Sequence, residues 1–335
     1  MHRGRIKLIK VGAMKKLPGI LACTIGAAVA FLFDAALHKL TGFSSVMLVA
    51  IALGMLVGNI RPLPATTNEG VRYTATSVLK FGVALLGLAI PAAAIIGLGW
   101  KVLATIICVV IAGFIATLTL GKVMGLSRSE ALMIGNGCTI CGAAAISATH
   151  GVLTKKKEHE FVTAIAVIAL LGTIMIFLGP AVVATWQPQA AGVFLGGSIH
   201  EVSQVVAAGG IAGAAVLPVA VTVKLGRVLL LAPVMAILSA FERRQAEGGK
   251  LPPLIPTFVI GFIALVLVRT FIPLPDFIVS TVDWVRNLLF AAAMFAQGTG
   301  VTVETMRRAG LRPFIFGVVI SLIVATVSLA GAMLL

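Results

Sequence analysis

The sequence predicts an all-α membrane protein, a polytopic bundle of about ten or eleven transmembrane helices. Hydrophobic residues make up 59% of the 335 residues and charged residues only 11%, whereas soluble domains carry about 25% charged residues. The mean hydropathy is +1.11, and the apolar residues form runs close to the roughly 20-residue length that a bilayer requires. Glycine-rich interruptions inside two of these runs predict helices that break at membrane depth.

The formal net charge of +15 does not indicate a nucleic-acid-binding protein. The basic residues lie between apolar runs, as the positive-inside rule expects of a membrane protein. Cys23, Cys108, Cys138 and Cys141 all fall inside apolar runs, so we expect no disulfide. We also expect no cofactor, no metal ion and no enzymatic activity. The expected partners are the bilayer and a small anion, and a homodimer is left open.

A basic segment, residues 1–16, precedes the first apolar run, residues 17–37. This run is about 20 residues long and lacks a small-residue cleavage site, which disfavours a secretory signal peptide. It therefore predicts a retained, peripheral first span within residues 17–40. The basic segment before it predicts a cytoplasmic N-terminus.

Ten further apolar runs predict ten further spans. They cover residues 44–60, 74–96, 100–120, 131–149, 161–184, 194–210, 214–240, 254–272, 279–301 and 313–335. With the N-terminus inside, Lys and Arg number sixteen in the cytoplasmic segments and seven on the opposite side. The run Lys155–Lys157 is the exception, and it would lie inside if the span before it were re-entrant. The sequence leaves both placements open.

A weak internal repeat relates residues 78–86 to residues 222–230, which share a lysine and a glycine without gaps. These segments belong to the third and eighth spans, and the same offset pairs the interrupted fifth and tenth spans. Five spans per repeat is an odd number, so the two repeats would have opposite orientations. Chance similarity between apolar segments is the alternative. The predicted domains are residues 1–16, the peripheral span 17–40, and two inverted repeats, 41–190 and 191–335.

Two cations, Lys224 and Arg227, lie in the middle of the apolar run 214–240. At about 1.5 Å per residue, both are roughly 15 Å or more from either end, too far to reach the interface. Each charge costs at least about 2.5–3.5 kcal/mol at the bilayer centre, and their i, i+3 spacing puts both on one helix face. We expect them, together with Lys80, to bind an anion. The alternative is a structural pair satisfied by backbone carbonyls or by Glu201.

The segment 135–148 reads Gly-Asn-Gly-Cys-Thr-Ile-Cys-Gly-Ala-Ala-Ala-Ile-Ser-Ala and predicts a helix that breaks and restarts. A helix N-terminus at membrane depth presents free amides and partial positive charge, which suits an anion. The alternatives are close packing through small residues and redox or metal chemistry of the two cysteines, which no second Cys or His pair supports. The candidate binding residues here and at the interruption of the tenth span are Asn136, Cys138, Thr139, Gln297 and Thr299.

The segment 196–210 is the most polar of the membrane segments. We expect Ser198, His200 and Gln204 to contact the substrate, and Glu201 or His200 to carry a coupling proton. A structural role of Glu201 as counter-charge to the two cations is the alternative. The His-Glu pair resembles a zinc-protease helix, but Gln204 stands where the second histidine ligand would be, so that interpretation fails.

Residues 139–148 and 197–209 together resemble the YeiH-type family of bacterial inner-membrane proteins, to which sulfate export is attributed by inference. The resemblance covers essentially the whole chain. Ala144 departs from the Ala-Ser-Ala that usually follows Ile-Cys-Gly in the family and removes one hydroxyl group. The family is grouped with the sodium/proton antiporter and bile-acid transporter superfamily. The resemblance therefore implies two inverted repeats with discontinuous helices that cross near the membrane midplane.

These observations predict a secondary transporter of a small anion such as sulfate or an organosulfonate, and the resemblance makes it an exporter. No ATP-binding signature is present, so an ion gradient or the membrane potential would drive transport. Three buried cations against one deep acid, Glu201, disfavour the first alternative, a cation/proton antiporter. An intramembrane hydrolase would need a positioned nucleophile beside His200 and Glu201. A channel and a sensor are further alternatives.

Overall fold

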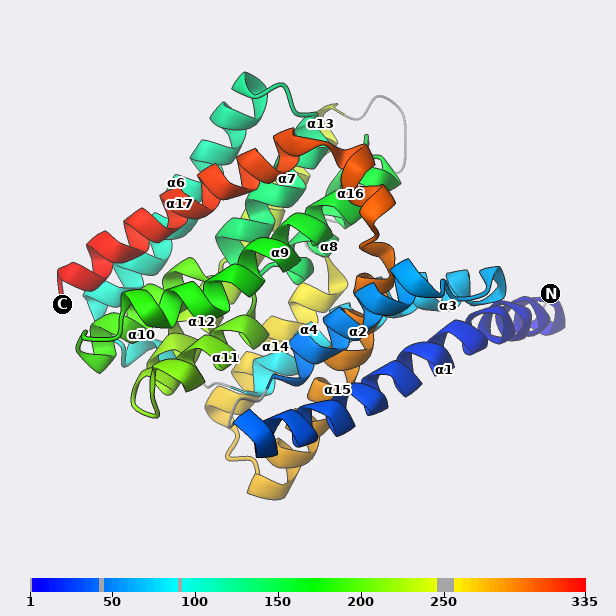
Figure 1. Ribbon diagram of the computed structural model, residues 1–335, viewed down its shortest axis with the longest axis horizontal. Coiled ribbons are helices and arrows are strands. Elements are labelled where there is room, and N and C mark those ends of the chain that lie inside the picture. Colours follow the sequence, from blue (N-terminus) through cyan, green and yellow to red (C-terminus); the bar gives the residue numbers. More distant parts are fainter. Residues whose placement is uncertain (1, 42–44, 90–91, 246–255) are drawn as a thin grey trace. The chain divides into compact units, whose positions relative to one another are not determined.

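The computed structural model is helical throughout its described regular elements, so the prediction of a polytopic helical bundle is confirmed (Figure 1). It describes residues 2–41, 45–89, 92–245 and 256–335. Within these ranges, six helices are long and apolar enough to cross a bilayer. They are Lys15–Leu40, Trp100–Val123, Glu158–Val182, Val216–Arg244, Asp276–Gly300 and Leu311–Met333.

The chain divides into two compact units. Unit 1 comprises residues 1–82 and 281–303, and unit 2 comprises residues 83–280 and 304–335. Each unit takes segments from both halves of the sequence, so the unit boundaries do not coincide with those of the predicted repeats. The inverted repeat itself stays a prediction.

Unit 1 is built from helices that cross at glycines. Its main helices are α1 (His2–Thr41), α2 (Val46–Ile60), α3 (Asn68–Tyr73) and most of α15 (Asp276–Gly300). A Cβ atom on Gly54 of α2 would lie 2.2 Å from the Phe295 carbonyl oxygen of α15, and one on Gly70 of α3 would lie 2.0 Å from the Lys16 carbonyl oxygen of α1. Larger residues at these crossings would force the helices apart.

The predicted third span, residues 74–96, is a chain of short pieces. They are a π-helical turn (Thr74–Val78), α4 (Leu79–Leu85), a 3₁₀ turn (Leu86–Leu88) and α5 (Ala92–Ile96). The hydroxyls of Thr74 and Thr76 donate to the carbonyls of Gly70 and Arg72. Such bonds compete with the regular helical ladder and accompany the π turn at this place.

Unit 2 has two ends that its long helices connect. The long helices are α6 (Trp100–Val123), α9 (Glu158–Val182), α12 (Val216–Leu229) followed by α13 (Leu231–Gln245), α14 (Thr257–Phe271) and α17 (Leu311–Met333). At the Lys101 end, Lys101 on α6 donates to the Leu334 carbonyl oxygen after α17, at 2.8 Å. At the Glu242 end, Glu242 on α13 accepts from Arg128, at 2.7 Å.

The apolar run 214–240 divides into α12 and α13 at Leu230. Pro233 follows three residues later, and proline cannot donate the backbone bond to the carbonyl four residues before it. The division leaves Lys224 and Arg227 on the last two turns of α12, well inside unit 2.

The segment 128–152 forms a helical hairpin, hairpin 1, rather than a crossing helix. It consists of α7 (Arg128–Asn136), a π-helical turn (Gly137–Cys141) and α8 (Ala143–Val152). α7 has 9 residues and α8 has 10, against 24 in α6, so each leg covers about 14–15 Å of a roughly 36 Å path. The hairpin begins and ends at the Glu242 end, because Glu160 at the start of α9 accepts from Ser127 and Ser129 at the start of α7.

The segment 188–212 forms a second hairpin, hairpin 2, from the opposite end. Its legs are α10 (Pro188–Ser198) and α11 (Val202–Ala212), with 11 residues each. One buried apolar cluster joins Ala191 and Ala208 of the two legs to Val102 at the start of α6 and Val216 at the start of α12. The outer parts of both legs therefore lie toward the Lys101 end.

The two hairpins correct the sequence-based topology in one respect. The fifth and seventh apolar runs turn back inside unit 2, so their discontinuities are hairpin tips and not midpoints of crossing helices. Lys155–Lys157 consequently lie at the same end as Arg128, where all four residues line one cavity. This answers the question that the sequence left open about this lysine run.

Candidate functional site

The tips of the two hairpins meet inside unit 2. The tip of hairpin 1 is formed by residues 137–143 and that of hairpin 2 by residues 198–201. Their direct link is the backbone N–H of Ala143, which donates to Oε1 of Glu201 at 2.8 Å. Almost every residue of both tips is buried, and Glu201 alone keeps intermediate exposure.

Gly142 makes the sharp turn at the tip of hairpin 1. Its φ is +66° and its ψ is −130°, a conformation that only glycine adopts without strain. A Cβ atom there would lie 2.2 Å from Cγ of Glu201. The glycine thus serves both the turn and the close approach of the carboxylate from the other hairpin.

Arg227 joins the two hairpins through their backbone carbonyls. Its side chain is fully buried, and its guanidinium donates six hydrogen bonds of 2.5–3.1 Å. The acceptors are the carbonyl oxygens of Cys138, Thr139, Gly196, Gly197 and Ile199. These carbonyls end the first leg of each hairpin, where a helix leaves its last acceptors unpaired and carries partial negative charge.

Lys224 reinforces the same arrangement from one turn earlier on α12. Its ammonium is fully buried and donates to the Ile199 carbonyl oxygen at 2.7 Å, an oxygen that Arg227 also reaches at 3.0 Å. The geometry therefore agrees with the carbonyl alternative for this pair. Because its N–H groups face carbonyls, what Arg227 adds to the surrounding site in this arrangement is its charge and not a free hydrogen-bond donor.

Glu201 holds the opposite pair of helix ends. It is the N-cap residue of α11, where a capping box links it to Gln204, whose Oε1 accepts from the Glu201 N–H at 3.1 Å. Its carboxylate also accepts from Ala143, the first residue of α8. One carboxylate thus occupies the N-terminal ends of both second legs, which carry partial positive charge.

The charges at the tips do not balance. Two C-terminal ends at about −0.5 and two N-terminal ends at about +0.5 cancel one another. The formal charges of the described residues at the tips are those of Lys224, Arg227 and Glu201, which leave one positive charge in excess. This excess is one formal positive charge inside unit 2, of the sign that an anion would neutralise.

Several buried polar atoms around the tips have no hydrogen-bond partner in the structure. They are Oδ1 of Asn136, Oγ1 of Thr139, Oγ of Ser147 and Nδ1 of His200. Buried polar atoms in native proteins are nearly always satisfied by protein, water or ligand. Three of the predicted site residues are in this set, so the tips offer polar contacts that the chain itself does not use.

His200 pairs with a serine that the sequence analysis missed. Its Nε2 lies 3.0 Å from Oγ of Ser321 on α17, and that hydroxyl donates to the Gly317 carbonyl at 2.7 Å. Oγ of Ser321 also lies 3.7 Å from Sγ of Cys138. A lone serine in a uniformly apolar span gives no pattern that marks it as a site residue, because such serines usually bond to their own helix.

The other predicted residues are placed as follows. Ser198 is buried and donates to the Phe194 carbonyl within α10. Lys80, Gln297 and Thr299 belong to unit 1, where Gln297 donates to the Ala75 carbonyl at 3.2 Å. α15 continues to Gly300, so the predicted interruption at 297–302 is confined to residues 301–302. Within unit 2 the interruption at 135–142 meets residues 196–201, and its pairing with the tenth span stays a prediction.

The chain is similar to a group of bacterial membrane proteins. Residues 18–317 match the family model described as Conserved hypothetical protein 698. A UPF0324 membrane protein of Corynebacterium glutamicum is 39% identical, with 97% of this chain and 95% of that protein covered. UPF0324 membrane proteins of Bordetella pertussis and Bartonella henselae are 36% and 33% identical, over 91% and 88% of this chain and 91% and 86% of theirs.

Proposed function

Because the chain belongs to the UPF0324 membrane-protein family, the YeiH-type family that its motifs resemble, we propose that it is a secondary transporter of a small anion. The bacterial inner membrane is the proposed location. Transport, rather than catalysis, is the role that the paired hairpins support best.

The meeting of the two hairpin tips carries this proposal. The two hairpins enter from opposite ends of unit 2 and touch at their tips. Each hairpin therefore separates the central meeting point from one end of the unit. Small movements of either tip would open the centre to one end at a time, which is what alternating access requires. The helix ends at the tips supply the backbone groups that bind an ion in such sites.

In the proposed mechanism, the transported anion takes the place of the Glu201 carboxylate. That carboxylate holds the N-terminal amides of α8 and α11, and such amides bind any suitably placed anion. Protonation of Glu201 would weaken its hold and free the amides for substrate. The substrate charge would then be balanced by Lys224 and Arg227, whose positions are fixed by the carbonyls of both first legs.

The excess of positive charge at the tips supports an anion over a cation as substrate. A cation/proton antiporter would need a buried surplus of acid, whereas here Glu201 stands against two cations. The substrate class of sulfate and organosulfonates, and export as the direction, rest on the family resemblance. Sulfate and sulfonate anions carry several oxygens, which could accept hydrogen bonds from the backbone amides at the N-terminal ends of α8 and α11 together.

The distribution of basic residues supports a cytoplasmic N-terminus and a cytoplasmic Glu242 end. Once Lys155–Lys157 are counted with Arg128, the predicted loops hold nineteen Lys and Arg inside and four outside, in place of sixteen and seven. The corrected topology thus agrees more closely with the positive-inside rule.

Flux into proteoliposomes tests the proposal. Vesicles containing the purified protein and loaded with sulfate should accumulate ³⁵S-sulfate by saturable counterflow, or do so with methanesulfonate or another small sulfonate. Glu201→Gln should retain counterflow and lose acceleration by a pH gradient. The proposal is rejected if no anion of the panel shows saturable exchange. Flux that never saturates indicates a channel instead.

The His200–Ser321 pair supports a second candidate, an intramembrane hydrolase. It supplies the hydroxyl that the sequence analysis lacked. However, the hydroxyl donates to Gly317 and Nδ1 of His200 has no orienting partner, both unlike an activated nucleophile. A fluorophosphonate probe would label Ser321 in the wild type and not in Ser321→Ala if this candidate were correct.

A further inference from the structure

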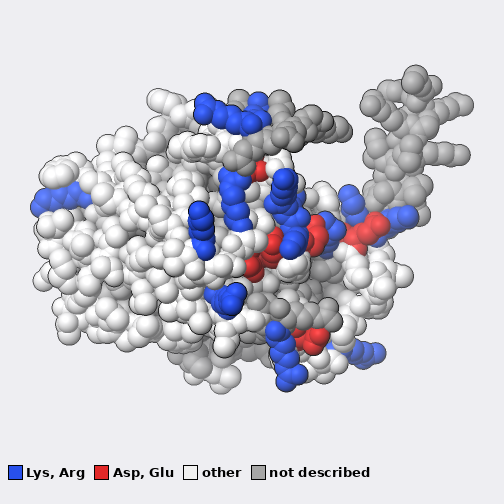
Figure 2. Space-filling model, turned by 90° about the horizontal axis from the view of Figure 1, so that it is seen from above, with Lys and Arg blue, Asp and Glu red and all other residues white. Residues whose placement is uncertain are grey.

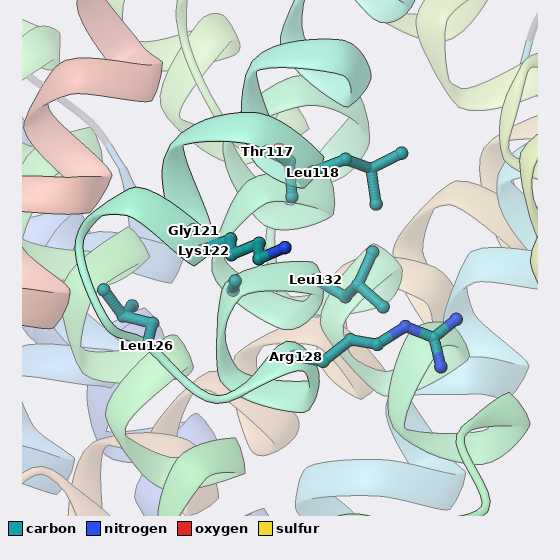
Figure 3. A pocket seen from close by; sticks show the side chains of 8 residues that line it. Thr117, Leu118, Gly121, Lys122, Leu126, Arg128 and Leu132 are labelled. Atoms are coloured by element: carbon teal, nitrogen blue, oxygen red, sulfur yellow. The ribbon is translucent and has the colours of Figure 1, made fainter.

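Two neighbouring cavities lie at the Glu242 end of unit 2, away from the hairpin tips. The first, here called the α6–α7 cavity, has a volume of about 270 Å³ and is lined by Thr117, Leu118, Gly121, Lys122, Leu126, Arg128, Ala131 and Leu132. Figure 3 shows its lining residues on α6, on α7 and in the turn between them, with Lys122 extending toward the space beside Leu118 and Leu132. Its wall is mostly apolar, and its two cations are Lys122 and Arg128, of which Arg128 also forms an ion pair with Glu242.

The second cavity, here called the lysine basin, has a volume of about 630 Å³. Its lining includes Arg128, which it shares with the α6–α7 cavity, and the consecutive lysines Lys155–Lys157. Figure 2 shows basic and acidic side chains gathered on part of the visible face, while wide areas carry neither.

The two acids of the lysine basin are already saturated with donors. Glu160 accepts from Ser127, Ser129 and the Lys157 N–H. Glu242 accepts from Arg128 and from both the N–H and the hydroxyl of Thr154. These carboxylates are therefore poorly placed to attract a positively charged group, and the net charge that the basin offers a ligand is positive.

We propose that the two cavities together bind one anionic phospholipid. Its phosphate lies between Lys122 and Arg128, its glycerol and first methylene groups lie along Leu118 and Leu132, and its headgroup extends into the lysine basin. Leu118 is 48% exposed, so the apolar wall of the cavity is open to a ligand from outside the chain. This site is distinct from the hairpin tips and does not depend on what they transport.

Three features favour an anionic lipid over other ligands of the same charge. An apolar wall gains nothing from inorganic phosphate but buries lipid methylene groups at about 25 cal/mol per Å². A zwitterionic lipid also carries a positively charged headgroup. Glu160 and Glu242 already accept hydrogen bonds from the protein, so neither is well placed to bind that positive group. The proposed cytoplasmic position of this end faces the leaflet whose anionic lipids attract basic clusters.

Thermal unfolding of the purified full-length protein in a neutral detergent tests this inference. Dioctanoyl phosphatidylglycerol is titrated beside dioctanoyl phosphatidylcholine, glycerol phosphate and inorganic phosphate. We expect stabilisation by the phosphatidylglycerol alone. Lys122→Gln should raise its half-saturating concentration about fivefold, the usual effect of one basic residue near an anionic lipid. The matched control is Lys101→Gln at the other end of the same helix, which should leave the titration unchanged.

A second variant, Leu118→Gln, tests the apolar wall at an exposed position where folding is not at risk. It should weaken stabilisation by phosphatidylglycerol. Equal stabilisation by inorganic phosphate or glycerol phosphate, lost in Lys122→Gln, would replace the lipid site with a small-anion site. Equal titrations of Lys122→Gln and Lys101→Gln would overturn the inference. Neither outcome bears on sulfate counterflow, so this inference and the proposed function fail separately.

Discussion

Hairpins 1 and 2 have the same outline, but the chain builds them by different means. Hairpin 1 turns at Gly142 with a positive φ, and polar bonds from Glu160 and Glu242 hold its outer ends. Hairpin 2 turns through extended backbone at Ile199 and Glu201, and apolar packing holds its outer parts. Directional contacts hold both tips, but the base of hairpin 1 is held by polar bonds and that of hairpin 2 by apolar burial.

This difference suggests which hairpin moves. Displacing hairpin 1 would break charge-assisted bonds at its base, each worth about 1.5–3 kcal/mol. Displacing hairpin 2 would break the polar bonds at its tip, but its outer parts would slide on small apolar residues such as Ala191 and Ala208. Within the proposed transport cycle, we therefore expect hairpin 2 to open more readily, and the following changes test the comparison.

Replacing Arg227 should have the largest effect, because this residue joins both hairpins. Arg227→Gln leaves most of five buried carbonyls without a donor, and removing one partner of a buried charged network typically costs about 3–5 kcal/mol. We expect a marked fall in the thermal unfolding temperature in detergent. Arg227→Lys should have an intermediate effect, because lysine keeps the positive charge but lacks the several planar N–H donors of the guanidinium. Arg312→Gln, at an exposed position, is the control. Equal stability of both Gln variants would refute the joint role.

Gly142→Ala should be next in size and should act on hairpin 1. The φ of +66° and the 2.2 Å approach to Cγ of Glu201 predict a loss of about 2–3 kcal/mol, from left-handed strain and displacement of the carboxylate. Gly210→Ala on hairpin 2 is the matched change, because a Cβ there meets nothing within 4 Å and alanine favours the helix. Thermal unfolding of both variants checks the contrast, and similar losses would contradict it.

Glu242→Gln should loosen the base of hairpin 1 by about 2 kcal/mol, because the amide loses charge-assisted bonds from Arg128 and Thr154. Hydrogen exchange should accelerate in α7 and α8 and stay unchanged in α10 and α11. Glu69→Gln, at an exposed position of unit 1, is the control. Faster exchange in hairpin 2 would show that the two bases are coupled.

Gly172→Ala should give the smallest effect, and it concerns hairpin 2. A Cβ there would lie 2.1 Å from Oε1 of Gln204, so the flexible side chain shifts and its bond with the Glu201 N–H is lost. The expected cost is about 1 kcal/mol, seen as faster hydrogen exchange in the first turn of α11. Gly261→Ala, whose Cβ would make an ordinary 3.5 Å contact, should leave that turn unaffected.

The sequence predicted the composition of the site better than its topology. Lys224 and Arg227 are buried and share one helix face as expected, and the predicted break at 135–142 is present, but the break at 196–201 was not predicted. Hydropathy and length do not distinguish a span from a hairpin, because each hairpin has about as many apolar residues as one span. The return of hairpin 1 depends on Glu160 and Glu242, which in the sequence look like ordinary residues at helix ends.

The partners of Arg227 could not have been read from the sequence either. Backbone carbonyls are present at every residue, so no residue type marks those that a buried guanidinium will meet. The pairing of the fifth run with the tenth rested on spacing alone and stays a prediction. Ser321 was missed because its contact with His200 depends on how the two helices pack, which the sequence does not show.

The bonds between Arg227 and hairpin 1 have a consequence for biosynthesis. The Thr139 carbonyl accepts from a side chain 88 residues further along the chain, so the first hairpin emerges from the ribosome before its partner exists. At 5–20 residues per second, that delay is about 4–18 s. During this interval the carbonyls at the tip of hairpin 1 need hydrogen bonds from water or from the insertion machinery. Hairpin 1 is therefore expected to be buried late in membrane assembly, after Arg227 has been synthesised.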